Sequence, residues 1–446
     1  MHIESSKKKW HPYSWQEKPA LQQPSYGDKT QVAEVLEILH AKPPLVSRGE
    51  IDRLLNELAE AAAGKRFLLH GGDCAERFSD CSAEALRRKL EVLLQMSLVL
   101  TYATRRPVIR IGRLAGQYAK PRSADEEIID GRSLPVYRGD LINDFSPDEK
   151  ARKADPCRMI EGYHHAAASL NYLRALIEGG FADLHHPEKW GAHFLHQCAD
   201  NQDYRRILDA IADAVRFMDM LGGDAADRLK RIAFYTSHEA LLLPYDAALT
   251  RQENEEHFYN LGAHYLWLGY RTSQLKGAHV EYLRGISNPV GIKVGAASDT
   301  EELVSLLQCL NPAHVPGRIT VITRFGAGKV KALLPPLINA IRKAHLPVLW
   351  CCDPMHGNTE SLADGRKTRH VHNIFSELEE SFAVHASLDS CLGGVHFEQT
   401  GEEVTECLGG NVTQHDLEAH YETACDPRLN GAQALEMAFL IARLLR

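Results

Sequence analysis

Four residues of this 446-residue chain combine donor types that suit a divalent transition metal. A thiolate, an imidazole and two carboxylates form a mixed soft and hard ligand set, which is unusual for Mg²⁺ or Ca²⁺. The four are Cys74, His356, Glu398 and Asp426. They lie far apart in the sequence, so their spacing alone is weak support for a shared site. The alternative is that Cys74 is a core residue, His356 lies in a turn and both acids are solvated.

A second set of candidates is basic. Its members are Arg113, Lys120, Arg122, Arg271, Lys293 and Arg324. For any one of them a solvated surface position is the simpler interpretation. Lys293 and Arg324 follow β-branched runs, however, and a charge at the end of a buried strand is seldom left unpaired. A guanidinium fork matches phosphate and carboxylate oxygens, so several converging cations predict a small substrate with several negative charges. Ser123, beside Arg122, indicates a second phosphate pocket.

Both sets gain support from their positions, because eight short apolar runs each lead to a polar residue. The runs are 67–70, 108–111, 232–235, 265–268, 290–292, 319–322, 348–350 and 393–397. Polar groups at the C-terminal ends of successive parallel strands are typical of the active-site face of a (β/α)8 barrel. We therefore predict an α/β fold, a (β/α)8 TIM barrel, with one site that binds a metal and phosphates.

The chain divides into three zones. Residues 1–64 include Trp10 and Trp15, and aromatic residues are scarce in disordered segments, so we expect an N-terminal extension packed on the barrel. Residues 65–446 are expected to form the catalytic barrel. An inserted loop at about 114–230 is longer than one crossover helix needs, and helical spacing at 159–177 and 204–221 predicts extra helices after the second strand. A last helix at 435–445 would close the barrel.

Composition narrows the function classes. The net charge of −8, with both signs mixed, argues against a nucleic-acid partner. No apolar stretch reaches the roughly 18 residues of a membrane span, and no apolar segment follows the basic start, so we expect neither a membrane protein nor a signal peptide. The ten cysteines show no paired framework and indicate reduced thiols in a cytoplasmic protein.

Three familiar motifs are broken or absent. The run Gly326-Ala-Gly328-Lys329 lacks the first glycine and the final Ser or Thr of a phosphate-binding loop. His238-Glu239 opens a zinc-protease pattern, but Leu242 stands at the second histidine position. Without a G-x-G-x-x-G run, a nicotinamide-binding fold has no support.

Long motifs along nearly the whole chain carry a resemblance to a known family. They include Gly71-Gly-Asp-Cys74-Ala-Glu76, Gly116-Gln-Tyr-Ala-Lys120-Pro-Arg122-Ser123, Tyr137-Arg-Gly-Asp140, Ser237-His-Glu-Ala240, Asp353-Pro-Met-His356-Gly-Asn-Thr359, Lys367-Thr-Arg369, Thr400-Gly-Glu-Glu-Val-Thr-Glu406-Cys and Cys425-Asp-Pro-Arg428. From about Trp10 to the C-terminus, the chain resembles the class II 3-deoxy-D-arabino-heptulosonate 7-phosphate (DAHP) synthases.

The resemblance implies a metal-dependent condensation of phosphoenolpyruvate with D-erythrose 4-phosphate and water, which gives DAHP and phosphate in the shikimate pathway. It implies Mn²⁺ or Co²⁺, with Zn²⁺ or Fe²⁺ as alternatives, on the ligands Cys74, His356, Glu398 and Asp426. It places phosphoenolpyruvate near Arg113, Lys293, Arg324 and Trp267, and the second substrate's phosphate near Arg122, Ser123 and Arg271, with Lys120 close to both. The expected catalytic residues are Lys120, Arg113, Lys293 and His356, and Glu239 or Glu76 is expected to orient the water. Expected partners are a second copy of the chain, in a homodimer or homotetramer, and a chorismate mutase.

Two of the departures from the family pattern change the charge at a position. Tyr270 stands where relatives carry an acidic residue, and Lys276 stands where they carry Asp. Sequence drift outside the site is one explanation, and altered substrate choice is the other. The alternatives are a secondary-metabolism paralogue that uses a related imino or amino aldose phosphate, and a catalytically silent regulatory paralogue. A metal-dependent aldolase or phosphatase would need motifs that this chain lacks.

Overall fold

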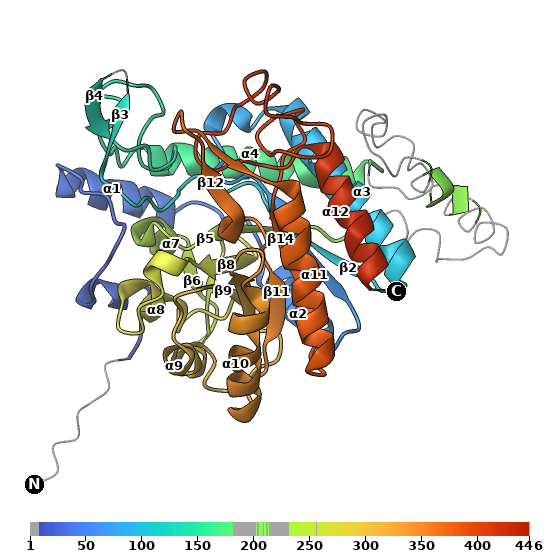
Figure 1. Cartoon of the computed structure of the whole chain (residues 1–446). Coiled ribbons are helices and arrows are strands. Elements are labelled where there is room, and N and C mark those ends of the chain that lie inside the picture. The colour runs from blue at the N-terminus through green and yellow to red at the C-terminus, as the bar shows by residue number, and fades with distance from the viewer. Residues whose placement is uncertain are drawn as a thin grey trace, which may run out of the picture.

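The structure, a computed structural model, describes residues 9–129, 131–181, 202, 205–207, 209–210, 213, 232–255 and 257–445. Its centre is a closed barrel of eight parallel strands in the order β1-β14-β11-β10-β9-β8-β5-β2 (Figure 1). The strands are β1 (Phe67–Gly72), β2 (Val108–Arg113), β5 (Tyr235–Glu239), β8 (Tyr265–Leu268), β9 (Val290–Gly295), β10 (Ile319–Arg324), β11 (Leu349–Cys352) and β14 (Leu392–Glu398). The predicted barrel fold is confirmed, and each of the eight apolar runs overlaps a strand.

The third strand of the barrel differs from the prediction. The apolar run 232–235 predicts a strand that ends before Ser237, but β5 begins at Tyr235 and continues through Glu239. All five of its residues are buried: Ser237 contacts His70 inside the barrel, whereas His238 on the other face contacts Asp246 of α7. A polar residue within a strand is invisible to a search for apolar runs.

Helices surround the barrel. In chain order they are α3 (Ala83–Thr104), α4 (Arg158–Glu178), α7 (Leu243–Ala248), α8 (Ala278–Leu283), α9 (Thr300–Leu310), α10 (Val330–Lys343), α11 (Val371–Ser387) and α12 (Gly431–Leu444). The chain starts several of them with capping residues: Asp299 accepts from two backbone N–H groups of α9, and Asn430 forms a capping box with Gln433 of α12. Helix α12 packs on α3 and α11, which brings the last helix beside the first strand–helix unit. In the part of the chain that the structure describes, no helix has the length and hydropathy needed to cross a bilayer.

The segment before β1 contains a short 3-10 helix (Ser14–Glu17), α1 (Lys29–His40) and α2 (Arg48–Ala62), whose start is a capping box of Ser47 and Glu50. Of these, α2 covers the N-terminal end of the barrel, whereas the 3-10 helix packs on α8, and α1 packs on α4 and α7. Leu54 and Leu58 of α2 are buried in one cluster with Leu68 and Leu349 from the strands. A Cβ on Gly393 would lie 2.7 Å from the Ala61 carbonyl oxygen, so this close approach of helix and strand requires glycine.

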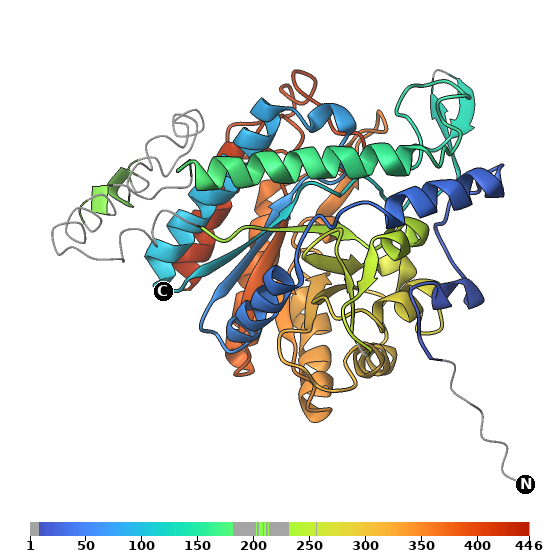
Figure 2. The same cartoon turned by 180° about the vertical axis from the view of Figure 1, so that it is seen from behind.

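Residues 114–181, which follow β2, rise above the opposite end. They form a hairpin of β3 (Glu126–Ile129) and β4 (Arg132–Pro135), and then α4, which lies across α3 and α1 (Figure 2). Helix α4 covers the range 159–177 in which the sequence indicates a helix. The second expected helix, 204–221, lies mostly outside the described residues. The inserted helices and the boundary at residue 64 therefore stay predictions. Smaller hairpins join β6 (Thr250–Gln252) to β7 (Phe258–Asn260) and β12 (Thr359–Ser361) to β13 (Lys367–Arg369).

Candidate metal and anion site

The four expected metal ligands meet at the C-terminal end of the barrel. Cys74 follows β1, His356 follows β11, Glu398 ends β14 and Asp426 lies in the loop before α12. Ligand atoms of Cys74, Glu398 and Asp426 all lie within 4.8 Å of one another. His356 is outside that tight group, but its Nε2 is 3.0 Å from the Glu398 Oε1 atom. The structure thus brings together four residues that span most of the chain.

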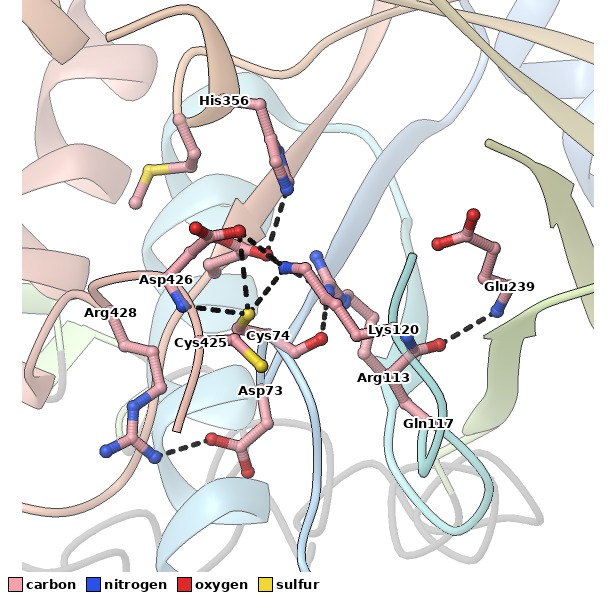
Figure 3. Close-up of polar contacts among 12 residues, drawn as sticks. Asp73, Cys74, Arg113, Gln117, Lys120, Glu239, His356, Cys425, Asp426 and Arg428 are labelled. Atoms are coloured by element: carbon pink, nitrogen blue, oxygen red, sulfur yellow. Dashed lines mark hydrogen bonds and ion pairs between the residues drawn. The ribbon is translucent and has the colours of Figure 1, made fainter. Parts of the chain in front are cut away.

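A cation already lies among these ligands. The Lys120 ammonium is 2.5 Å from Cys74 Sγ, 2.7 Å from Asp426 Oδ2 and 3.2 Å from Glu398 Oε1 (Figure 3). Burial alone would lower the pKa of Lys120, but the anionic groups, Asp426 foremost, hold that pKa well above its ordinary value. A thiol and two carboxylates that converge on one positive charge are the arrangement that a divalent metal needs.

The carboxylates of the site are held ionised. Burial alone would raise the pKa of Glu398, but the surrounding cations, His356 and Lys120 foremost, keep it well below its ordinary value. Asp426 shows the same balance, with Lys120 as the main cause of its lowered pKa. Burial raises the pKa of the Cys74 thiol well above its ordinary value, with neighbouring Cys425 as the next cause. Because a metal binds the thiolate, metal uptake at this site has to release a proton from Cys74.

Asp353 orients two of the expected site residues. Its Oδ2 atom accepts from His356 Nδ1 at 2.7 Å and from Lys293 Nζ at 2.5 Å. This leaves His356 Nε2 directed at Glu398 and the ligand cluster, as in the carboxylate–histidine–metal arrangement common in metalloenzymes. Burial lowers the pKa of Lys293 to about 8, even though Asp353 opposes the shift.

The basic residues line one cavity of about 220 Å³ beside the ligand cluster. Of the expected site residues, Cys74 and Glu398 are buried beneath it and the others are on its wall: Arg113, Lys120, Arg122, Ser123, Trp267, Arg271, Lys293, Arg324, His356 and Asp426. The predicted convergence of cations is therefore observed. It comes from different strands, because the carboxyl ends of β2, β8, β9 and β10 share one rim.

Within the cavity, the cations form two groups. Arg113, Lys293 and Arg324 lie on strands β2, β9 and β10. Arg324 donates to the His356 carbonyl at 2.8 Å, and the Nε atoms of Arg113 and Arg324 are buried without a hydrogen-bond partner among the described residues. Buried donors without partners are costly, so these two groups are poised to meet acceptors on a ligand.

The second group lies nearer the outside. Arg271 belongs to a 3-10 helix after β8 (Tyr270–Thr272), and its guanidinium donates to Ser123 Oγ at 2.7 Å. Arg122 donates to Cys425 Sγ at 3.4 Å and pairs with Glu127 at 3.2 Å. One wall of the cavity therefore carries a separate set of donors for an anion.

The two candidates for orienting water are in different environments. Glu76 is buried and accepts three backbone N–H groups, those of residues 115–117, at 3.0–3.1 Å, so it fixes the loop after β2. Glu239 lines the cavity, and its Oε1 is buried without a hydrogen-bond partner among the described residues. Burial raises the pKa of Glu239, against the lowering effect of cations such as Lys120. Only Glu239 is free to act on a molecule in the cavity.

Several residues of the site were not expected from the sequence. Lys367 lines the cavity and contacts Asp426 Oδ1 at 2.7 Å, while Arg369 pairs with Glu398 Oε2 at 2.7 Å. Asp353 belongs with them. All three residues lie in motifs that carry the family resemblance, which was the signal that could have identified them.

A buried ion network supports the two loops that carry Cys74 and Asp426. Asp73 contacts Arg428 at 2.8 Å (Figure 3) and Lys89 at 2.5 Å, and Arg428 also pairs with Glu406 at 2.7 Å. Since Asp73 precedes Cys74 and Arg428 lies two residues after Asp426, this network joins the first ligand loop to the last. Partners at this distance from a metal orient its ligands.

Two histidines lie directly beneath the site. Burial, with a further contribution from the cations Lys293 and Arg113, lowers the pKa of both His70 and His396 well below its ordinary value. Both imidazoles are therefore neutral, although they are close to a strongly charged cavity.

This geometry coincides with a clear family relationship. Residues 10–442 match the sequence model of the class-II DAHP synthetase family. The chain belongs to that family. The resemblance carried by the sequence motifs is thus confirmed, and with it the expected enzyme class, DAHP synthase.

Curated relatives agree with this assignment. The chain is 46% identical to a phospho-2-dehydro-3-deoxyheptonate aldolase of Neurospora crassa, over 97% of this chain and 94% of the relative. It is 45% identical to the protein of the same name from Streptomyces coelicolor, over 97% of each chain. A third relative, phospho-2-dehydro-3-deoxyheptonate aldolase AroG of Mycolicibacterium smegmatis, is 44% identical over 96% of this chain and 93% of its own.

Proposed function

We propose that the chain condenses phosphoenolpyruvate with D-erythrose 4-phosphate and water at a divalent metal, which gives DAHP and phosphate. The observation that carries the proposal is a cavity in which a cluster of Cys, His, Glu and Asp, two of them buried and two partly buried, adjoins two separate groups of cations. A reaction between two phosphorylated anions needs both parts, because the substrates repel each other and one of them must be made electrophilic.

The metal would be held by Cys74, His356, Glu398 and Asp426. Mn²⁺ or Co²⁺ fits this donor set best, and Zn²⁺ or Fe²⁺ is the alternative. When bound, the metal supplies a Lewis acid for the aldehyde oxygen of the second substrate. The position of the Lys120 ammonium among the ligands supports the assignment, since it marks the point at which their negative charges converge.

The inner cations would hold phosphoenolpyruvate. Arg113, Lys293 and Arg324 surround the part of the cavity next to the ligand cluster, and the Trp267 ring lies 5.2 Å from the Arg113 guanidinium. The outer group, Arg122, Ser123 and Arg271, would hold the phosphate of the aldose. Lys120 lies between them. Holding both anions in register turns their encounter into a step within one complex.

Carbon 3 of phosphoenolpyruvate then attacks the aldehyde carbon, and positive charge develops at carbon 2. Water adds at carbon 2 before phosphate leaves, and the proton that this water loses needs an acceptor. Glu239 is the group we assign to this role, because its buried Oε1 lines the cavity and burial raises the pKa of the carboxyl. Lys120, which lines the cavity beside the ligands, would stabilise the aldehyde oxygen as it gains charge, and His356 would act by holding the metal.

The alternative substrates receive no support from the two departures from the family pattern. Tyr270 lies beside Arg324, whose guanidinium is 5.6 Å from the ring centre, so this change bears on the phosphoenolpyruvate side of the cavity. An aldose and its imino analogue would share that side. Lys276 is exposed and does not line the cavity. A silent paralogue would require a missing ligand or clamp, and the chain retains all of them. The homo-oligomer and the chorismate mutase partner stay predictions.

The test is phosphate release from phosphoenolpyruvate in the presence of a panel of aldose phosphates, with and without Mn²⁺ or Co²⁺. We expect release only with metal, and fastest with erythrose 4-phosphate. Preference for another aldose phosphate would overturn the proposed second substrate. Equal release after metal removal with a chelator would overturn the metal role.

A further inference from the structure

A row of four hydrogen-bonded polar side chains crosses the barrel interior beneath the cavity. It begins at Arg113 on β2 and continues through His396 on β14 and His70 on β1 to Ser237 on β5. Arg113 NH1 is 3.0 Å from His396 Nε2, the two Nδ1 atoms of His396 and His70 are 2.9 Å apart, and His70 Nε2 is 2.8 Å from Ser237 Oγ. The Ser237 hydroxyl then donates to the Gly112 carbonyl at 3.0 Å. All four side chains are at most 2% exposed.

Arg113, the first residue of this hydrogen-bonded row, fixes the direction of every hydrogen bond in it. A guanidinium has donors and no acceptor, so His396 Nε2 must accept from Arg113. The proton of neutral His396 is therefore on Nδ1 and is donated to His70 Nδ1. That atom must be an acceptor, which places the His70 proton on Nε2, directed at Ser237. A second proton on either ring would set two donors against each other.

A layer of polar side chains such as this one is unusual in the interior of a barrel. Layers of this kind are normally filled by Val, Ile and Leu, and buried polar groups cost stability unless each is satisfied. Here the rings are also fixed from the side, because the Trp267 ring centre is 5.5 Å from that of His70 and 5.8 Å from that of His396. As a result, His396 Nε2 is held in one orientation, as a hydrogen-bond acceptor for Arg113.

That acceptor restrains a guanidinium with a competing partner. Arg113 NH2 contacts the Cys74 carbonyl at 2.8 Å and Glu398 Oε1 at 3.2 Å (Figure 3). Without that restraint NH1 could also turn toward Glu398 Oε1, since Glu398 is the carboxylate that Arg113 contacts, whereas Oε2 is held by Arg369. With NH1 held by His396, only NH2 reaches Glu398. The Nε atom stays buried without a partner among the described residues.

We propose that His396, in its Nδ1–H form and oriented by His70, positions Arg113 so that the guanidinium binds the anionic substrate instead of turning further toward Glu398. The identity of that substrate, phosphoenolpyruvate, rests on the proposed function. His396 acts through Arg113 and is a positioning residue.

Two matched variants test the acceptor. His396→Leu removes it, whereas in His396→Gln the side-chain oxygen replaces Nε2 as an acceptor for Arg113. With the Mn²⁺-loaded enzyme, we expect His396→Leu to weaken phosphoenolpyruvate binding roughly 10- to 100-fold in calorimetry and to raise its KM similarly. The KM of the aldose phosphate should change less than about 3-fold, and His396→Gln should restore most of the affinity. Unchanged affinity in the Leu variant, or equal loss in both variants, would overturn the proposal.

A second measurement does not depend on turnover. Nitrogen-15 NMR of histidine-labelled wild-type protein, with the His396→Gln spectrum used to assign the missing signals, should show the proton of His396 on Nδ1. A proton on Nε2 overturns the inference whatever the substrate is. If the tautomer is as stated and phosphoenolpyruvate binds, but no aldose phosphate reacts, the proposed function fails while the positioning role stands.

Discussion

At the N-terminal end of the barrel, Leu54 and Leu58 of α2 are fully buried against Leu68 and Leu349, whereas at the C-terminal end the fully buried side chains include Glu398, Arg369 and Asp73. The two ends of the same strands exclude water equally well, but one does so with apolar groups and the other with charges. Apolar burial lowers the free energy of the folded state directly. Buried ion pairs have to offset a large desolvation cost and add little net stability. Stability and chemistry are thus placed at opposite ends of the barrel.

A change in the ligand cluster gives the strongest test of this difference between the two ends. Cys74→Ser should lower metal content and activity together, with activity falling roughly 1000-fold or more, because loss of a ligand exceeds the 10- to 100-fold cost of losing a partner behind one. Unfolding of the metal-free protein should be unchanged. Metal analysis and denaturant titration measure the two effects. Cys157→Ser, at an exposed thiol, is the control. A fully active Cys74→Ser protein without metal would rule out the ligand assignment.

The apolar end should respond in the opposite way. Leu54→Ala opens a cavity beneath the barrel and should lower the free energy of unfolding by about 2–5 kcal/mol. The folded variant should keep its metal affinity and its KM values, since α2 contacts the barrel at the end away from the site. Urea unfolding and steady-state kinetics test this. Ile38→Ala, on the exposed side of α1, should change stability by less than about 0.5 kcal/mol. A large change in KM for Leu54→Ala would show that the ends are coupled.

A carboxyl at the charged end should make stability depend on pH. Glu377 of α11 accepts from the Phe325 backbone N–H and from Asn358 Nδ2, both at 2.7 Å, and so joins the loops after β10 and β11. Burial, the largest cause, raises its pKa from 4.5 to about 7. Between these values the folded state holds a proton that the unfolded state has lost.

The contribution of Glu377 to stability therefore falls as pH rises from 4.5 to 7, by about 3 kcal/mol in total. Glu377→Gln should remove this pH dependence. Unfolding free energies of both proteins at pH 5 and pH 8 measure it. If the difference between the two proteins is the same at both pH values, Glu377 is ionised throughout.

The smallest effect is expected from an exchange of one cation for another. Arg324→Lys keeps the charge but loses the planar fork, so it should weaken the binding of phosphoenolpyruvate by about 1–3 kcal/mol without changing metal affinity. Arg271→Lys is the matching change in the outer group of cations and should instead weaken the binding of the aldose phosphate. Competition and KM measurements for both substrates separate the two. If Arg324→Lys affected only the aldose phosphate, our division of the cavity would be wrong.

The sequence by itself determined the number of strands, the position of every strand except β5, and the family. This was possible because apolar runs and turn residues are local, and because a parallel barrel sends every strand's carboxyl end to one rim. Cys74, Arg113, Lys293 and Glu398 could each be placed at that rim from their position after or within an apolar run.

Only the tertiary structure decided which of these groups touch. Most of these contacts join residues far apart in the chain. Asp353 binds both Lys293 and His356, Arg369 pairs with Glu398, and Arg428 pairs with Asp73. Periodicity gives the face of a strand but not the partner across the barrel. The polar strand β5 was misplaced for the same reason, since its histidine and serine are satisfied by neighbours that no local pattern shows.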